Sequence, residues 1–239
     1  MKLRAKAYLR IAAEEWRKKY DTIGPFFEGL ARVRLGDKWG FVDRTGKELV
    51  PPSYDEVWDF DEGFAGVKLK GKWGFVNKQG KEVVPLYYEY VDYFHNGFAK
   101  VGLEDKYGFV DETGNEVILP KYDSAERVYR FDKDFIMVEL EGKHGLIDNT
   151  GNEVVPPKYD GVEDFSEDFV RVYLDEQYGF FDRTGKEVIP CIYEEEDLPD
   201  IEEDIPGLSL LIREKYEQDP EGLEFIRPHF DWKDWYNRS

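Results

Sequence analysis

The side chains best suited to chemistry are scarce and scattered. The chain has three histidines and one cysteine, at His95, His144, His229 and Cys191. No histidine lies near Cys191, so the sequence shows no base that would activate its thiol. Acidic pairs such as Asp164/Asp168 lack the spacing and the glycine of a calcium loop, and no glycine-rich phosphate loop occurs. We therefore predict a non-enzymatic protein with no catalytic residues, no metal site and no cofactor.

The abundant carboxylates and tyrosines recur at a fixed period. The periodic glutamates are Glu48, Glu82, Glu116, Glu153 and Glu187, for which we expect outward, cross-strand positions rather than acid–base roles. The periodic tyrosines are Tyr20, Tyr54, Tyr88, Tyr122, Tyr159 and Tyr193, spaced by 34 residues except for one interval of 37. A repeat of this length predicts supersecondary units that bury their apolar faces by stacking on their neighbours.

Each period has the pattern of antiparallel strands. In the second period Ala65, Val67 and Leu69 alternate with other residues, as a half-buried strand requires. A tight turn follows, and then a turn such as Asp43–Gly46, in which the aspartate bonds the backbone ahead and the glycine takes the left-handed conformation. We predict three strands per unit and a shorter fourth run near the tyrosine.

Glycine and proline positions predict the strand register within each unit and where strand pairing stops. If the second turn sets the register, Phe41 lies opposite Leu49 and Trp39 lies opposite Pro51. Gly40 then faces the other side of the sheet, where its missing side chain allows a close approach. Proline cannot donate to a ladder, so we expect strand pairing to stop at Pro51, Pro85, Pro120, Pro156 and Pro190.

The motif Lys-Trp-Gly-Phe-Val-Asp-x-Thr-Gly-Lys-Glu-x-Val-Pro resembles the bacterial WG-repeat proteins, and the resemblance runs from about Tyr20 to Tyr193. It implies a β-repeat array and no particular reaction. The Trp-Gly pair itself stands at Trp39 and Trp73, while Tyr107, His144 and Tyr178 replace the tryptophan. The residues that define the repeat are Trp39, Gly40, Gly46, Trp73, Gly74, Gly80, Tyr107, Gly108, Gly114, His144, Gly145, Gly151, Tyr178, Gly179 and Gly185.

We therefore predict an all-β repeat array, an open solenoid-like stack of five antiparallel β-meander units with helical caps at both ends. A five-bladed β-propeller is the alternative, although its blades usually need a longer period. The expected units are 20–53, 54–87, 88–121, 122–158 and 159–192. Residues 1–19 read as an amphipathic capping helix whose Leu9 and Trp16 face the first unit. Residues 194–239 read as an acidic linker followed by a helical and aromatic cap.

The net charge of −19 limits the classes of partner. Residues 1–20 carry +5, residues 21–193 carry −14 and residues 194–239 carry −10. Such an acidic chain repels phosphates and anionic lipid, so we predict no direct nucleic-acid or membrane binding. The single cysteine and the lack of a long apolar run favour a cytoplasmic protein. The oligomeric state is not encoded.

The leading hypothesis is a protein-interaction or scaffold module that presents a repeated acidic surface to another protein, with a cationic protein as one candidate. One alternative is an acidic decoy that mimics nucleic acid and inhibits a cationic protein. A glycan-binding or glycan-active protein is the other. Candidate binding residues are a basic stripe on the strands and two C-terminal tryptophans: Arg32, Arg34, Lys68, Lys100, Arg171, Trp232 and Trp235. Cross-strand neutralisation of acids is the ordinary explanation of the stripe.

Overall fold

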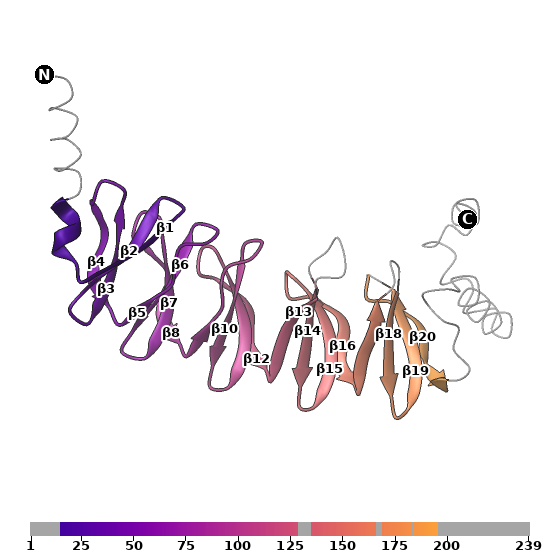
Figure 1. Ribbon diagram of the computed structural model, residues 1–239. Coiled ribbons are helices and arrows are strands. Elements are labelled where there is room, and N and C mark those ends of the chain that lie inside the picture. Colours follow the sequence, from indigo (N-terminus) through magenta and orange to yellow (C-terminus); the bar gives the residue numbers. More distant parts are fainter. Residues whose placement is uncertain (1–14, 129–134, 166–168, 183, 196–239) are drawn as a thin grey trace, which may run out of the picture. The chain divides into compact units, whose positions relative to one another are not determined.

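A computed structural model describes residues 15–128, 135–165, 169–182 and 184–195. In these ranges the protein is an all-β repeat array of five antiparallel sheets, each made of four strands that are consecutive in sequence (Figure 1). The predicted fold class is thus confirmed, and none of these sheets closes into a barrel. The expected helix of residues 1–19 is described only as the 3₁₀ helix η1 (Glu15–Lys19). The rest of that expected cap, and the expected C-terminal cap beyond residue 195, lie outside the described residues.

The strands of the five sheets have the following bounds. Sheet 1 is β1 (Thr22–Phe27), β2 (Leu30–Leu35), β3 (Lys38–Asp43) and β4 (Glu48–Tyr54). Sheet 2 is β5 (Glu56–Val57), β6 (Phe64–Leu69), β7 (Lys72–Asn77) and β8 (Glu82–Tyr88). Sheet 3 is β9 (Tyr90–Val91), β10 (Phe98–Leu103), β11 (Lys106–Asp111) and β12 (Glu116–Tyr122). Sheet 4 is β13 (Ser124–Val128), β14 (Phe135–Leu140), β15 (Lys143–Asp148) and β16 (Glu153–Tyr159). Sheet 5 is β17 (Gly161–Phe165), β18 (Phe169–Leu174), β19 (Gln177–Asp182) and β20 (Glu187–Tyr193).

The chain divides into two compact units. Unit 1 comprises Met1–Ala125 with Asn149–Gly151, and unit 2 comprises Glu126–Asp148 with Asn152–Ser239. Sheets 1 to 3 therefore lie in unit 1, and most of sheet 4 and all of sheet 5 lie in unit 2. Each unit has its own stack of sheets and its own apolar core.

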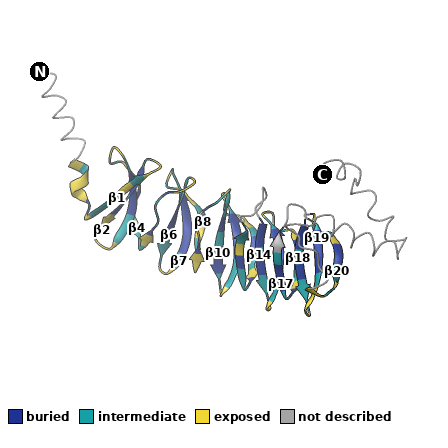
Figure 2. Cartoon of the chain, turned by 45° about the vertical axis from the view of Figure 1, so that its right-hand side comes forward, coloured by how far each residue is buried: buried dark blue, intermediate teal, exposed yellow. Residues whose placement is uncertain are grey.

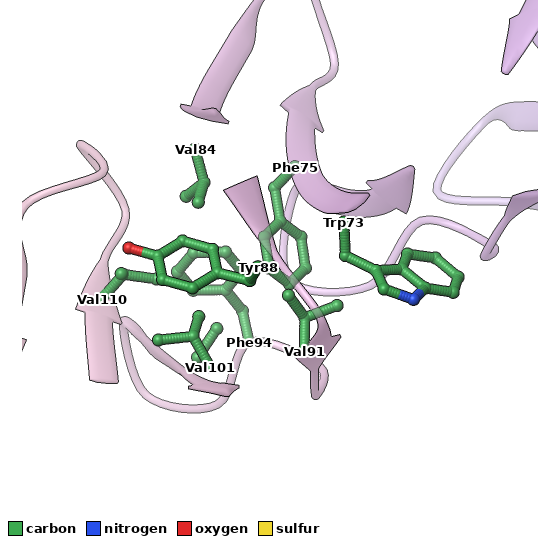
Figure 3. Packing of buried hydrophobic residues seen from close by; sticks show 9 residues of the cluster. Trp73, Phe75, Val84, Tyr88, Val91, Phe94, Val101 and Val110 are labelled. Atoms are coloured by element: carbon green, nitrogen blue, oxygen red, sulfur yellow. The ribbon is translucent and has the colours of Figure 1, made fainter. Parts of the chain in front are cut away.

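Within unit 1 the sheets pack face to face because both faces of the third strand are apolar. Phe41 of sheet 1 packs with Ala65, Val67 and Val76 of sheet 2. Phe75 of sheet 2 in turn packs with residues of sheet 3, and Figure 3 shows it beside Phe94, with the ring centroids 4.8 Å apart. The same packing occurs in unit 2, where Leu146 of sheet 4 joins a cluster with Val170 and Val172 of sheet 5. Figure 2 shows this buried interior along the strands and exposure at the turns.

The predicted register of the third and fourth strands is wrong. Phe41 pairs with Val50 and Trp39 pairs with Tyr54, with irregularities on both sides of Phe41. The strand continues past Pro51 to Tyr54, so proline interrupts the pairing but does not end it. A side chain on Gly40 would lie 2.7 Å from backbone atoms of both Pro51 and Pro52. Gly40 therefore allows the expected close approach, and the group that approaches is the displaced proline backbone of its own hairpin.

The periodic glutamates have the expected cross-strand positions, and Glu48 and Glu116 also bind a tyrosine. The Tyr20 hydroxyl donates to Glu48 at 2.5 Å, and the Tyr88 hydroxyl of sheet 2 donates to Glu116 of sheet 3 at 2.9 Å. Burial and the hydrogen bond to Glu116 raise the pKa of Tyr88. Glu48 and Glu116 thus each satisfy the hydroxyl of a buried tyrosine, whereas the buried Tyr159 hydroxyl has no hydrogen-bond partner among the described residues.

The aspartate turns have the predicted geometry. The Asp111 carboxylate accepts hydrogen bonds from the Thr113 amide at 2.8 Å and the Asn115 amide at 2.9 Å, while Gly114 has a φ of +86°. Desolvation opposes the charged form of Asp111, but the hydrogen bonds from Thr113 and Asn115 outweigh it and lower the pKa to about 2. The carboxylate is therefore the form that holds the turn.

This turn gives an acid-sensitive contribution to stability. Because the folded pKa of Asp111 lies below its ordinary value, its contribution is complete above about pH 4 and is lost as the pH falls toward 2. We expect Asp111→Asn to reduce the decline in unfolding free energy between pH 4 and pH 2.5, because Asn77 holds the equivalent turn of sheet 2 without a titrating group. Urea unfolding at a series of pH values measures this, and an unchanged pH slope in the variant would contradict it.

Candidate functional site

The tight turns between the second and third strands carry exposed acidic residues in sheets 1, 3, 4 and 5, whereas the turn of sheet 2 has Lys70 and Gly71. We call the carboxylates at these turns the acidic tips: Asp37, Glu104, Asp105, Glu141, Asp175 and Glu176. All six residues are exposed. Among the residues that the structure describes, Asp37, Glu104, Asp105 and Glu176 form no ion pair, and the charge of Asp175 acts on Lys143. Most of this negative charge is therefore available to a partner.

The backbone of these turns is fixed by the acidic residue that follows each repeat tyrosine. Asp55 accepts a hydrogen bond from the Lys70 amide at 2.7 Å, Glu89 accepts one from the Glu104 amide at 3.1 Å, and Asp160 accepts one from the Asp175 amide at 2.8 Å. Glu104 and Asp105 have φ angles of 52° and 59°, the left-handed conformation that a two-residue hairpin of this kind requires. The tips are thus held in defined positions relative to their own sheets.

The same acidic residues also connect successive sheets. Lys38 of sheet 1 binds Asp55 at 2.5 Å, Lys72 of sheet 2 binds Glu89 at 3.0 Å, and within unit 2 Lys143 binds Asp160 at 2.5 Å. Lys106 binds Asp123 in the same way. Hydrogen bonds from these lysines are the main cause of the lowered pKa of Asp55, Glu89 and Asp160. These four ion pairs, which we call the clamps, use four lysines that would otherwise offset the acidic tips.

The basic stripe predicted from sequence lies over aromatic rings. In sheet 1, Arg34 lies over Trp39 at 5.7 Å and Arg32 lies over the same ring at 5.8 Å. Elsewhere Lys68 lies over Trp73 at 5.2 Å, Lys100 over Tyr107 at 4.5 Å, and Arg171 over Tyr178 at 5.4 Å. Each cation thus meets the ring in the Trp-Gly register of its own sheet, at a distance typical of cation–π contacts.

Three of these cations also form ion pairs. Lys68 binds Glu56 at 2.7 Å and Arg171 binds Glu163 at 3.3 Å, both within one sheet, while Arg32 of sheet 1 binds Asp59 of sheet 2 at 3.3 Å. The stripe is divided between the two units, with Arg171 alone in unit 2. The other two candidate binding residues, Trp232 and Trp235, lie outside the described residues.

Trp58, Asp59 and Tyr93 were not among the site residues predicted from sequence. Trp58 and Tyr93 contact each other between sheets 2 and 3, and Asp59 pairs with Arg32 of sheet 1. The Trp58 and Tyr93 rings stack with centroids 4.7 Å apart and an interplanar angle of 28°. One signal was available, because these residues depart from the repeat. Asp92 stands 34 residues after Trp58, and Tyr93 stands 34 residues after Asp59.

The residues of the Trp-Gly register recur at one structural position. Trp39 pairs with Tyr54, Trp73 with Tyr88, Tyr107 with Tyr122, His144 with Tyr159 and Tyr178 with Tyr193. A sequence model of the WG containing repeat matches residues 18–39, 39–73, 73–107, 107–143, 145–177 and 178–195. The chain belongs to the WG-repeat family. Each full match joins the third strand of one sheet to the third strand of the next, so the WG repeat crosses the boundary between two sheets.

Comparison with solved structures gives only distant similarity to this WG-repeat chain. A eukaryotic initiation factor has 12% identity and a TM-score of 0.40, over 73% of this chain and 54% of the other. The dihydro-heme d1 dehydrogenase NirN has 10% identity and a TM-score of 0.34, over 72% and 47%. Hsv2p of Kluyveromyces lactis has 10% identity and a TM-score of 0.33, over 70% and 63%. The chain therefore spans about half to two thirds of these structures.

A comparison with curated proteins found no match. In the described part of the WG-repeat chain, no helix is long and apolar enough to cross a membrane. The same ranges contain no group of three or more His, Cys, Asp or Glu side chains that could hold a metal ion. Cys191 is half-buried, and burial raises the pKa of its thiol to about 11. The thiolate needed for nucleophilic chemistry is therefore disfavoured at this position.

Proposed function

We propose that this WG-repeat chain is a non-enzymatic interaction module that binds a cationic protein through its acidic tips. The observation that supports the proposal most is the fixed backbone of these exposed turns, which carry carboxylates without ion-pair partners at Asp37, Glu104, Asp105 and Glu176. Preorganised charges lose little conformational entropy on binding, so they favour association with a surface of opposite charge. The net charge of −19 adds long-range attraction to such a partner.

The clamps explain why the negative charge of the tips is not neutralised by nearby lysines. Lys38, Lys72, Lys106 and Lys143 are held by carboxylates that follow the repeat tyrosines. Arg32, Lys68 and Arg171 are held by ion pairs and by aromatic rings. These contacts fix seven cations against the scaffold, whereas the tip carboxylates extend from it. Much of the positive charge is thus used internally, and negative charge is presented at four of the five tight turns, the turn of sheet 2 carrying Lys70 instead.

This proposal predicts a loss of binding that depends on where charge is removed. We expect the variant Glu104→Gln/Asp105→Asn/Glu176→Gln to bind a 20-residue lysine peptide about three- to tenfold more weakly than the unchanged protein. Titration calorimetry at 50 mM and 300 mM salt measures both the affinity and its dependence on ionic strength. The affinity of the unchanged protein should fall steeply with salt because exposed charges are screened.

The control variant removes the same charge from the other end of the sheets. Glu82→Gln/Glu112→Gln/Glu187→Gln changes three exposed glutamates at or beside the turns between the third and fourth strands. We expect less than about a twofold loss from this variant. Equal losses in the two variants would show that only net charge matters and would exclude the tips as the binding surface. Salt-independent binding would exclude an electrostatic interface altogether.

A further inference from the structure

An exposed aromatic stack in unit 1 offers a second, more specific contact surface. Trp58 follows β5, and its amide donates to the Gly66 carbonyl at 2.8 Å. A side chain on Gly66 would lie 2.7 Å from the Trp58 ring, so the glycine provides the space in which the indole lies. The indole contacts Trp73 at 4.8 Å on sheet 2 and Tyr93 at 4.7 Å on sheet 3. Tyr93 is nevertheless 45% exposed, which makes it the outer member of the stack.

The aromatic rings of the Trp-Gly register show which partner such a ring binds in this chain. In sheets 1, 2, 3 and 5 the ring of the Trp-Gly register has a lysine or arginine of the same chain over it. Tyr93 is different, because no lysine or arginine among the described residues lies over its ring in this way. An exposed ring without an internal cation can accept one from a partner.

The charges around Tyr93 favour a cation at this ring. Burial, and then the negative charge of Asp59, raise the pKa of the Tyr93 hydroxyl, with smaller contributions from Asp61 and Asp92. Arg32 acts in the opposite sense and forms the 3.3 Å ion pair with Asp59. Asp61 and Asp92 are exposed and remain as excess negative charge beside the ring. An anionic ligand would be repelled here, and a cationic side chain would gain from both the ring and the carboxylates.

We propose that Tyr93, stacked on Trp58 and flanked by Asp61 and Asp92, is a docking point for an arginine or lysine side chain of the partner protein. This inference rests on the proposed function and deepens it, since it adds a local contact to the long-range attraction of the acidic tips. Arginine suits the site best, because its planar guanidinium can stack on the phenol ring while its N–H groups donate to a carboxylate. The partner sequence should therefore present an arginine within its basic surface.

The test uses two matched peptides and three forms of the full-length chain. The probes are a decapeptide of alternating arginine and glycine, and the same peptide with the uncharged isostere citrulline in place of arginine. Tyr93→Leu should weaken binding of the arginine peptide about two- to fivefold, whereas Tyr93→Phe, which keeps the ring, should change it by less than about 1.5-fold. Binding of the citrulline peptide should not distinguish the three proteins.

A local readout separates docking at the ring from general charge attraction. In protein labelled at tyrosine, the ring resonances of Tyr93, assigned by their loss in Tyr93→Leu, should shift on addition of the arginine peptide. Thermal unfolding of Tyr93→Leu close to that of the unchanged protein keeps the comparison valid, because Tyr93 is an exposed residue.

Each negative result of this test would contradict a different part of the proposal. Equal affinity of the arginine peptide for Tyr93→Leu and the unchanged protein would overturn the Tyr93 contact and leave the acidic tips as the interface. Equal dependence on Tyr93 for the arginine and citrulline peptides would show uncharged stacking, of the kind a sugar ring would make, and would also overturn it. Absence of salt-dependent binding by the unchanged protein would overturn the proposed function together with this inference.

Discussion

Replacing Gly114 by alanine should lower the free energy of unfolding by about 3–4 kcal/mol, the sum of a left-handed backbone penalty and an overpacking penalty. Gly114 lies in the second turn of sheet 3 with a φ of +86°, and an added Cβ would overlap the Val83 carbonyl oxygen in sheet 2. The obstacle is backbone, so no rotation of a side chain relieves it. Sheets 2 and 3 would have to separate locally, which would also weaken the core between them. Urea unfolding followed by far-ultraviolet circular dichroism measures the loss.

Gly71→Ala is the matched control for this prediction. Gly71 has a φ of +81°, close to that of Gly114, but nothing lies within 4 Å of a Cβ added there. This variant should therefore lose only the backbone term of about 1–2 kcal/mol. Similar losses at the two glycines would mean that the close approach of successive sheets contributes little to stability, and that the turn conformation alone explains why glycine stands at this position.

Gly114 illustrates what could be predicted from the sequence and what could not. The period, the strands and the left-handed turn followed from local patterns, because alternation and turn chemistry act over a few residues. The second reason for Gly114 is contact with Val83, which belongs to the preceding sheet. A contact across 31 residues has no local signature, so the turn motif suggested only one of the two constraints.

The predicted register of β4 was wrong for a related reason. Counting from the turn assumes a continuous ladder, and that assumption places Trp39 opposite Pro51. Leu49 is unpaired, which places Phe41 opposite Val50 before the prolines are reached. The ladder is interrupted again before Trp39 pairs with Tyr54. Pro51 and Pro52 lie in this second interruption and cannot donate hydrogen bonds, but sheets 2 and 3 have the same register with one proline each. Gly40 accommodates the displaced backbone. Proline predicts missing hydrogen bonds, but the strand accommodates them by a displaced backbone and does not end.

The candidate site was predictable only where it follows the repeat. The basic stripe was found from strand alternation, but its ring contacts and the Arg32–Asp59 pair depend on neighbouring strands and sheets. Trp58 and Tyr93 could not be predicted from the repeat, because aspartates stand at the equivalent positions, Asp92 and Asp59. In a repeat protein the scaffold explains the common residues, so departures at exposed positions are better indicators of a specific contact.

Replacing Trp73 by alanine should cost about 3–5 kcal/mol of unfolding free energy, the range expected when a large buried aromatic side chain is removed. Trp73 is only 8% exposed and belongs to the core between sheets 2 and 3, where Figure 3 shows it beside Val91. Its ring also supports Trp58 at 4.8 Å and lies under Lys68 at 5.2 Å. Circular dichroism in urea gives the global loss, and amide exchange should show reduced protection in sheets 2 and 3 more than in sheet 5.

The chain supplies its own conservative control for this position. Tyrosine stands in the same register at Tyr107 and Tyr178, so Trp73→Tyr should keep an aromatic ring against the core and under Lys68, at a cost below about 1.5 kcal/mol. A loss from Trp73→Tyr as large as that from Trp73→Ala would show that the indole shape itself is required at Trp73. A small loss in both variants would show instead that the glycine of the WG pair, through its backbone contact with Val84 and Pro85, carries the structural role of the motif.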